Sequence, residues 1–233
     1  MKIHVGTKWV ALLVTMALCM GVTAAEDKAV NAATNKAPVK LACVGDSITQ
    51  GVGASQGHAY PALLQPLLGE TWEVRNFGLS GTTLLKNGDA SYWICKPFRD
   101  AKAFVPDVVT IALGTNDSKP QNWVHKDQFL SDYKALIEEF RKVNPKVIVY
   151  ACLPVPAFPG RWGINEPAIS GEVIPLIRQA AKESKAEVID LHAALAGRNM
   201  CFPDTVHPND AGQTLIAQAI ARTLTNKAVT DSK

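Results

Sequence analysis

Short apolar runs and stretches with helical periodicity alternate along this chain from residue 39 onward. Five runs predict β-strands, and they lie at Val39–Val44, Trp72–Phe77, Val108–Leu113, Lys146–Leu153 and Glu187–Leu191. Five stretches predict helices, at Tyr60–Leu68, Pro97–Phe104, Asp127–Val143, Glu172–Lys185 and Asn209–Leu224. Strands separated by helices form a parallel sheet that is covered on both faces. The pattern therefore predicts the α/β class, with a five-stranded parallel sheet in a flavodoxin-like three-layer α/β/α sandwich.

The first 38 residues do not share this alternation. Residues 1–25 begin with Lys2 and Lys8, continue with the apolar stretch Trp9–Val22 and end in the small residues Thr23–Ala25. This order is typical of a secretory signal peptide, and the apolar stretch is too short for a comfortable membrane span. We therefore expect a secreted or periplasmic protein with a signal peptide over 1–25, a flexible leader over 26–38, a single domain over 39–226 and a tail over 227–233.

The charge balance argues against several classes of partner. The chain has 24 Lys and Arg residues against 21 Asp and Glu residues, for a formal net charge of +3. It contains no basic run and no interleaving of basic and aromatic residues, so we expect no nucleic-acid partner. No segment after the signal is long and apolar enough to span a membrane, so we expect no stable membrane insertion. The sequence leaves the oligomeric state open.

Four cysteines follow the expected signal peptide: Cys43, Cys95, Cys152 and Cys201. Their spacing fits no zinc-binding pattern, and we expect neither a metal nor another cofactor. Cys43 and Cys152 lie within predicted strands and are most simply small core residues. Cys95 and Cys201 lie in loop-like stretches, where an exported protein could join them in a disulfide. The sequence alone leaves that pairing open.

Polar clusters follow four of the five predicted strands. They are Gly45–Ser47 after the first strand, Asn76–Gly81 after the second, Gly114–Asp117 after the third and Phe202–Pro208 after the fifth. The carboxyl ends of parallel strands meet at one edge of the sheet, which is where ligands bind in open α/β folds. We therefore expect all four clusters to gather on one rim.

Two of these clusters carry groups that acyl transfer by a serine needs. Ser47 directly follows a buried strand, where a hydroxyl can be both held rigidly and reached by a substrate. The alternative is a turn that merely caps the next helix. His207 is the candidate base, and Asp204 stands three residues before it, a spacing that one turn can close into a hydrogen bond. The alternative for this pair is a helix start capped by Asp204 or Asn209.

A serine nucleophile also needs donors for the oxyanion that develops on the substrate carbonyl. The side-chain amide of Asn116 and the backbone N–H groups of Ser47 and Gly78 are our candidates. A glycine suits a position at which the backbone must approach a ligand closely.

The order of these blocks resembles that of the SGNH hydrolases, also called GDSL-type esterases. The matching residues are Gly45-Asp-Ser-Ile48, Gly78, Gly114-Thr-Asn-Asp117 and Asp204-Thr-Val-His207. The resemblance implies that Ser47 is the nucleophile and the first oxyanion donor, that Gly78 and Asn116 are the other donors, and that His207 is the base oriented by Asp204. It extends over essentially the whole chain after the leader.

Two departures from familiar patterns accompany this resemblance. Ile48 stands where the family name has leucine, which changes no catalytic atom. Thr49 stands where a Gly-x-Ser-x-Gly elbow would have its second glycine, and this argues against the ordinary α/β-hydrolase fold.

Within the family the chain looks most like secreted bacterial carbohydrate acetylesterases, of the sialate O-acetylesterase and acetylxylan esterase kinds. The finer likeness rests on Arg75–Gly78, Gly114–Pro120 and Leu153–Pro159. Candidate substrate contacts are Asp46, Arg161 and Trp162. Trp162 could stack on a sugar or simply pack within its Pro-rich and Gly-rich loop. Asp117 is expected to brace the loop of Asn116 rather than to contact substrate.

The sequence thus predicts a secreted serine esterase that removes short acyl groups, with acetyl foremost, from carbohydrate. Its expected partner is a small-molecule or polysaccharide acyl ester. The first alternative is a lysophospholipase or acyl thioesterase of the same fold, which a chain-length series would separate. A non-catalytic carbohydrate-binding domain is a third hypothesis, but it would require a broken site, whereas Ser47, Asn116, Asp204 and His207 are all present.

Overall fold

The computed structural model describes residues 37–158 and 161–230. The expected signal peptide and most of the expected leader therefore lie outside the described residues. Within the described residues, no helix combines the length and the apolar character needed to cross a membrane.

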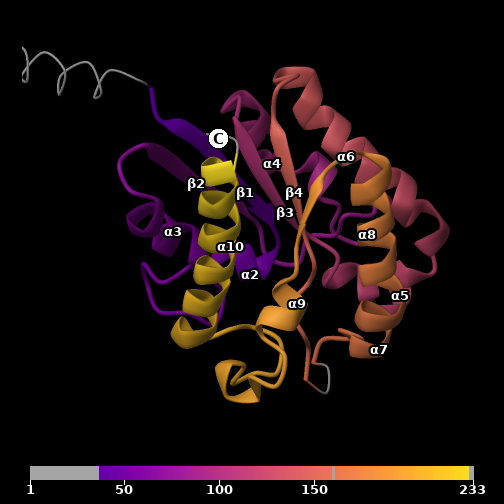
Figure 1. The fold of residues 1–233 in the computed structure, drawn as a ribbon. Coiled ribbons are helices and arrows are strands. Elements are labelled where there is room, and N and C mark those ends of the chain that lie inside the picture. The colour runs from indigo at the N-terminus through magenta and orange to yellow at the C-terminus, as the bar shows by residue number, and fades with distance from the viewer. Residues whose placement is uncertain (1–36, 159–160, 231–233) are drawn as a thin grey trace, which may run out of the picture. The chain divides into compact units, whose positions relative to one another are not determined.

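Five parallel strands form the centre of the described domain (Figure 1). They are β1 Val39–Gly45, β2 Trp72–Gly78, β3 Val108–Ala112, β4 Ile148–Cys152 and β5 Glu187–Ile189, in the order β2-β1-β3-β4-β5. Gly45 at the end of β1 is level with Gly78 on one neighbour and Ala112 on the other. The strands that precede three of the polar clusters therefore end at the same edge, as predicted for a five-stranded parallel sheet.

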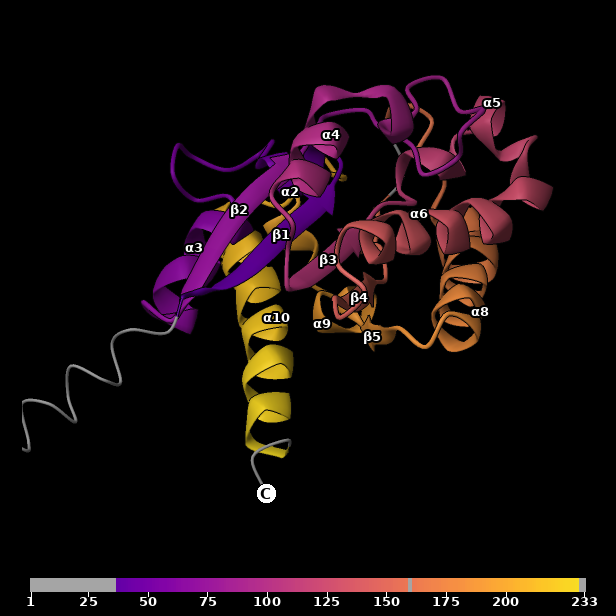
Figure 2. The ribbon, with the colours of Figure 1, turned by 90° about the horizontal axis from the view of Figure 1, so that it is seen from above.

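Helices cover both faces of this sheet (Figures 1 and 2). The longer helices are α3 Tyr60–Leu68, α4 Lys96–Ala103, α6 Phe129–Val143, α8 Ile174–Glu183 and α10 Asp210–Thr230. Short turns of α-helix are α2 Ser47–Gln50, α5 Pro120–Trp123, α7 Glu166–Ala168 and α9 Leu191–Ala194. The 3₁₀ turns are Tyr92–Ile94, Asn116–Ser118, Lys126–Gln128 and Asn199–Cys201, and a π-helical turn at Ile169–Val173 leads into α8.

The alternation of side chains along β1 divides the core into two clusters. Ala42 and Val44 belong to a cluster with Phe98 of α4 and Phe140 of α6, whereas the alternate residues of β1 face α3 and α10. This is the two-sided burial that a central parallel strand requires, and it confirms the three-layer α/β/α sandwich.

The expected helix at Asn209–Leu224 extends further than predicted. Helix α10 begins at Asp210 and continues to Thr230, so its last turn occupies part of the segment that we expected to be a tail.

The predicted and observed ends of the strands differ by only a few residues. β5 stops at Ile189 because the side chain of Asp190 accepts the Ala193 N–H and starts α9.

The disulfide that the sequence left open is not formed. Cys95 and Cys201 both carry free thiols. Cys95 packs against the core cluster shared by α4 and α6, whereas Cys201 packs against the cluster shared by α3 and α10. The two side chains therefore belong to opposite sides of the sheet, and this separation explains why they do not pair. Cys43 and Cys152 are buried core residues.

Candidate active site

Ser47 lies at the first position of helix α2, immediately beyond β1. Its neighbour Asp46 is the residue that caps the helix, because Asp46 Oδ1 accepts the Ile48 N–H at 2.9 Å. Capping by Asp46 leaves the Ser47 hydroxyl available for another partner. The two interpretations of the Gly45–Ser47 turn are therefore compatible, since one residue caps and the next presents its hydroxyl.

Ser47, His207 and Asp204 form a continuous chain of hydrogen bonds. The Oγ atom of Ser47 lies 2.9 Å from Nε2 of His207, and Nδ1 of the same ring lies 2.8 Å from Oδ2 of Asp204. Ser47 and His207 are 6% and 9% exposed, so the contact is largely shielded from water and still reachable. This geometry allows the imidazole to accept the serine proton while the carboxylate fixes the ring.

The turn from Asp204 to His207 is shaped to make that contact. Asp204 Oδ1 accepts the backbone N–H groups of Val206 at 2.9 Å and His207 at 2.6 Å. Thr205 between them has φ +73°, a left-handed conformation that is unusual for a residue other than glycine. Partial burial acts to raise the pKa of Asp204, but the N–H groups of His207 and Val206 and the His207 ring hold that pKa below its usual value. Asp204 is therefore an anion at neutral pH.

Asn116 follows β3 on the same rim and is almost fully buried. Its Nδ2 donates to the Thr82 carbonyl at 3.1 Å, which uses one of the two amide hydrogens. Asn122 Nδ2 donates to the backbone carbonyl of Asn116 at 2.9 Å and so holds the main chain at this position. The bond to Thr82 orients the side-chain amide and leaves its second hydrogen for a substrate oxygen.

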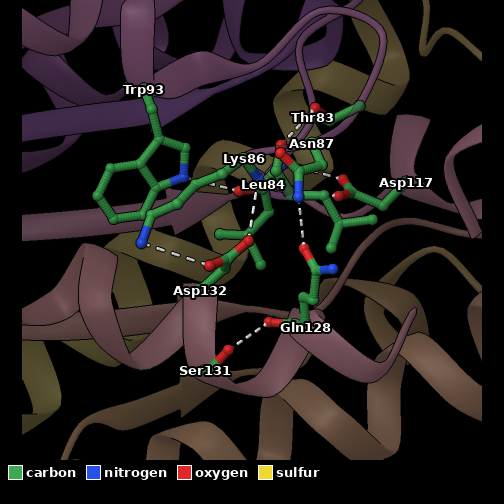
Figure 3. Close-up of polar contacts among 10 residues, drawn as sticks. Thr83, Leu84, Lys86, Asn87, Trp93, Asp117, Gln128, Ser131 and Asp132 are labelled. Atoms are coloured by element: carbon green, nitrogen blue, oxygen red, sulfur yellow. Dashed lines mark hydrogen bonds and ion pairs between the residues drawn. The ribbon is translucent and has the colours of Figure 1, made fainter. Parts of the chain in front are cut away.

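Asp117, next to Asn116, braces the loop that carries Thr82. Its two carboxylate oxygens accept the N–H groups of Leu84 at 3.0 Å and Leu85 at 2.8 Å (Figure 3). Further along the loop, Asp132 of α6 accepts the Lys86 N–H at 2.9 Å. Asp117 is fully buried and therefore does not contact substrate, as expected, but the loop that it braces is the one carrying Thr82 rather than its own. Burial raises its pKa to about 7.

The structure does not support Gly78 as the second backbone donor. The Gly78 N–H donates to Asn76 Oδ1 at 2.8 Å, and Asn76 Nδ2 in turn donates to the Thr49 carbonyl at 2.8 Å. A Cβ at residue 78 would lie 2.3 Å from the Gln50 nitrogen, so this glycine allows β2 and α2 to pack closely. Its N–H is already engaged within the protein, which is why it does not serve as a free donor.

Gly81 is a functional candidate that our sequence reasoning missed. It has φ +82°, open space on the side where a Cβ would stand, and an N–H that no described residue accepts. It directly precedes Thr82, the partner of Asn116. The signal was present in the sequence, because Gly81 closes the Asn76–Gly81 cluster that we had placed on the rim.

Asp46 does not reach the substrate side, contrary to our expectation. Its side chain is buried, with one oxygen capping α2 and Oδ2 without a hydrogen-bond partner among the described residues. Burial raises the pKa of Asp46 to about 6, although the Ile48 N–H and the charge of His207 act in the opposite direction. The carboxyl is therefore buried at the start of α2 and is not exposed to a substrate.

Trp162 and Arg161 do lie beside the candidate site. The Trp162 ring centroid is 5.2 Å from that of His207, and the Arg161 guanidinium is 5.1 Å from the Trp162 ring. Trp162 is 54% exposed, so it is not a core residue. Both side chains are therefore placed where a bound substrate could contact them.

The loop between α2 and α3 packs against His207, a contact that our sequence reasoning also missed. Ser55, in the loop between α2 and α3, donates its hydroxyl to Asp210 Oδ2 at 2.6 Å and its N–H to Oδ1 at 2.7 Å. Asp210 begins α10 three residues after His207. A Cβ at Gly53 of the same loop would lie 2.8 Å from the Cβ of His207, so this loop packs directly against the histidine.

No cluster of three or more potential metal ligands occurs among residues 37–158 and 161–230. The arrangement at the rim is instead a serine, a histidine, a carboxylate and an amide. A parallel α/β/α sandwich with these groups at its strand ends is the arrangement expected of a serine hydrolase.

Residues 43–215 match the GDSL-like lipase/acylhydrolase family, and the chain belongs to this family. Among curated proteins, an acetylxylan esterase of Xylanibacter ruminicola is 38% identical over 205 residues, which cover 78% of this chain and 42% of the relative. The cellulase/esterase CelE of Acetivibrio thermocellus is 26% identical over 128 residues, which cover 55% of this chain and 15% of that protein. The chain thus spans less than half the length of these curated relatives.

Solved structures share the fold. The acetyl xylan esterase AlAXEase matches with a TM-score of 0.63 at 26% identity, over 79% of this chain and 99% of the other. Est24, a carbohydrate acetylesterase from Sinorhizobium meliloti, matches with a TM-score of 0.67 at 19% identity, over 81% and 99% of the two chains. The second likeness supports the fold alone.

Proposed function

We propose that this chain is a serine esterase that hydrolyses short acyl esters, chiefly acetyl esters, on carbohydrate. The observation that carries the proposal is the hydrogen-bonded chain of Ser47, His207 and Asp204 at the strand ends. Membership of the GDSL-like lipase/acylhydrolase family supports ester hydrolysis, and the likeness to an acetylxylan esterase supports acetyl as the acyl group.

The proposed reaction begins with attack of Ser47 Oγ on the ester carbonyl. His207 Nε2 accepts the serine proton, and Asp204 stabilises the imidazolium that forms. When the tetrahedral intermediate collapses, the C–O bond to the sugar breaks and His207 returns the proton to the departing alcohol oxygen. A water then repeats the sequence on the acyl-serine, so that acetate leaves and the Ser47 hydroxyl is restored.

We assign three donors to the oxyanion. They are the backbone N–H groups of Ser47 and Gly81 and the free hydrogen of Asn116 Nδ2. Each such donor stabilises the negative charge that appears only in the transition state, and one donor is worth a factor of about 10²–10³ in kcat. The bond from Asn116 Nδ2 to the Thr82 carbonyl supports this assignment, because it orients the side-chain amide before substrate arrives, while Asn122 holds the Asn116 backbone.

The carbohydrate specificity is supported by the surroundings of the site. Trp162 presents an exposed ring beside His207, where it could stack on a sugar. The sequence from Leu153 to Gly163 lacks the long apolar run that a groove for a fatty chain would need. We further propose, from the pattern of residues 1–25, that the protein is secreted or periplasmic and meets glycans there.

A chain-length series tests the proposal against its main alternative. Each methylene that fits a pocket gains about 0.8 kcal/mol by burial, so a preference for acetyl requires a steric stop. We expect acetyl esters to exceed octanoyl esters in kcat/KM by at least about tenfold. Equal or faster hydrolysis of octanoyl esters, without acetate release from glycans, would instead identify a lysophospholipase or thioesterase.

A further inference from the structure

Two cationic side chains border the candidate site without forming an ion pair with any described residue. Arg161 precedes Trp162, and Lys119 follows Asn116 by three residues. Neither appears in a salt bridge within residues 37–158 and 161–230, whereas Arg75, Arg141 and Arg178 each pair with a carboxylate. The charge of Lys119 acts on two carboxyl groups. Asp89 accepts hydrogen bonds from the amides of Asn122 and Gln121, and Asp46 is buried.

The residues on either side of Arg161 are hydrogen-bonded to two parts of the candidate site, the segment after Asn116 and the turn from Asp204 to His207. The Asn165 N–H donates to Ser118 Oγ at 3.0 Å, two residues after Asn116. On its other side, the Phe158 N–H donates to the Thr205 carbonyl at 2.8 Å, between Asp204 and His207. The loop is therefore anchored on the oxyanion side and on the histidine side at once.

Lys119 and the Arg161 loop also touch each other. A Cβ at Gly163 would lie 3.8 Å from Lys119 Cγ, so the lysine stem runs along the backbone next to Trp162. Two loops that follow different strands thus lie side by side at this part of the rim, and each carries a cationic residue. The guanidinium and the His207 ring both contact the same indole ring.

The backbone conformation of Trp162 is a further observation in favour of a ligand-binding site at this edge of the sheet. Its φ is +55°, which is unusual for a bulky residue and costs on the order of 1–3 kcal/mol. Strain of this kind persists where the surroundings impose it, and it concentrates at ligand-binding sites. Here the strained residue holds its ring against His207 and carries the Arg161 guanidinium on the same ring.

We propose that Arg161 and Lys119 bind a carboxylate on the substrate, so that the preferred substrates are acetylated saccharides bearing a uronic acid close to the acetyl ester. The inference rests on the proposed esterase function and names the substrate class of that same site. A guanidinium presents a planar fork that matches the two oxygens of a carboxylate, and the ammonium adds a mobile positive charge. The indole ring of Trp162 would then pack against the apolar face of the same sugar.

The test compares two acetylated monosaccharides of nearly the same shape, of which one carries a negative charge and the other is neutral. One is an O-acetylated methyl glucuronoside, and the other is the same compound with the carboxylate replaced by a carboxamide. Acetate release gives kcat/KM for each. The ratio of the two values is measured for the wild type, for Arg161→Met, Arg161→Lys and Lys119→Met, and for the control Arg222→Met. Arg222 is an exposed arginine twelve residues along α10 from Asp210.

We expect the wild-type ratio to favour the carboxylate, and Arg161→Met to lower that ratio about threefold to tenfold, the range of a partly exposed charge pair. Arg161→Lys should retain part of the preference, and Arg222→Met all of it. The ratio should also fall as salt is raised, because exposed charges are screened within about 10 Å at 0.1 M salt.

A wild-type ratio near one, or a ratio that Arg161→Met and Lys119→Met leave unchanged, would overturn the anionic-substrate proposal. That result is distinct from failure of the proposed function, in which neither acetyl ester would be hydrolysed by the wild type. Thermal melting of each variant identifies loss of fold, and Arg161→Lys tests the same charge with the least change in shape.

Discussion

Nε2 of His207 lies 2.9 Å from Oγ of Ser47, although 160 residues separate them in the chain. The contact exists because β1 delivers Ser47 to the carboxyl edge of the sheet, and the turn before α10 brings His207 back to that edge. Asp204 anchors the turn through two backbone N–H groups and the imidazole together. The proposed chemistry depends on this contact between Ser47 and His207.

Replacement of Ser47 by alanine tests directly whether the Ser47 hydroxyl is the nucleophile. We expect Ser47→Ala to lower kcat by at least about 10³, because Ser47 Oγ is the atom that forms the proposed acyl intermediate. The hydroxyl contributes little to the core, so the melting temperature should stay close to that of the wild type. A folded Ser47→Ala protein with near-normal turnover would rule out Ser47 as the nucleophile.

Asn116→Ala should lower kcat by about 10²–10³ with a modest change in KM, because the lost amide donor acts on the transition state. Asn87→Ala is a matched control, since Asn87 donates to Gln128 Oε1 in an exposed contact on the neighbouring loop. Steady-state kinetics of the two variants, alongside thermal melts, separate catalysis from stability. A rise in KM alone would make Asn116 a binding residue.

Ser55→Ala should reduce kcat by about twofold to tenfold. The Ser55–Asp210 contact fixes the loop that packs against His207, so its loss should leave the imidazole less precisely positioned. The variant removes the 2.6 Å hydrogen bond to Asp210 and leaves Ser47, His207 and Asp204 unaltered. Ser131→Ala removes an exposed hydroxyl bond elsewhere, to the Gln128 carbonyl, and serves as the control. Equal kcat values for both variants and the wild type would show that the loop does not position the histidine.

The buried carboxyl of Asp46 gives a prediction about pH and stability. Its pKa is about 6 in the folded protein, so between about pH 4 and 6 the folded state keeps a proton that the unfolded chain has released. The contribution of Asp46 to the free energy of unfolding therefore falls as pH rises through this window. Asp46→Asn removes this term, while its Oδ1 can still accept the Ile48 N–H.

Urea unfolding at pH 4.5 and pH 7.5 tests this sign. We expect the stability of Asp46→Asn relative to the wild type to be greater at pH 7.5 than at pH 4.5. Asp117 adds a dependence of the same sign up to about pH 7, but it is present in both proteins. A relative stability that is independent of pH would mean that Asp46 titrates normally.

The fold and four members of the candidate site could be predicted from the sequence for a physical reason. Buried parallel strands are short apolar runs, and the polar residues that follow them must share an edge. This argument placed Ser47, Asn116 and His207 together without coordinates, and the three-residue spacing to His207 added Asp204. It selected Gly78 and missed Gly81, because the choice between them depends on where Asn76 directs its side chain.

Other features required the three-dimensional structure because they join distant residues. The bond from Ser55 to Asp210 spans 155 positions, and neither residue is part of a recognisable motif. The burial of Asp46 depends on how tightly α2 packs beneath β2, and the opposite locations of Cys95 and Cys201 depend on which face each loop covers. Local sequence patterns carry no information on such packing.

Acetate release from acetylated xylan, with the wild type and Ser47→Ala measured side by side, tests the central claim most directly. The proposed function predicts that the wild type liberates acetate continuously and that the folded Ser47→Ala variant liberates none above the uncatalysed rate. The absence of acetate release by the folded wild type from xylan and from soluble acetylated sugars, or equal release by the two proteins, would contradict the account.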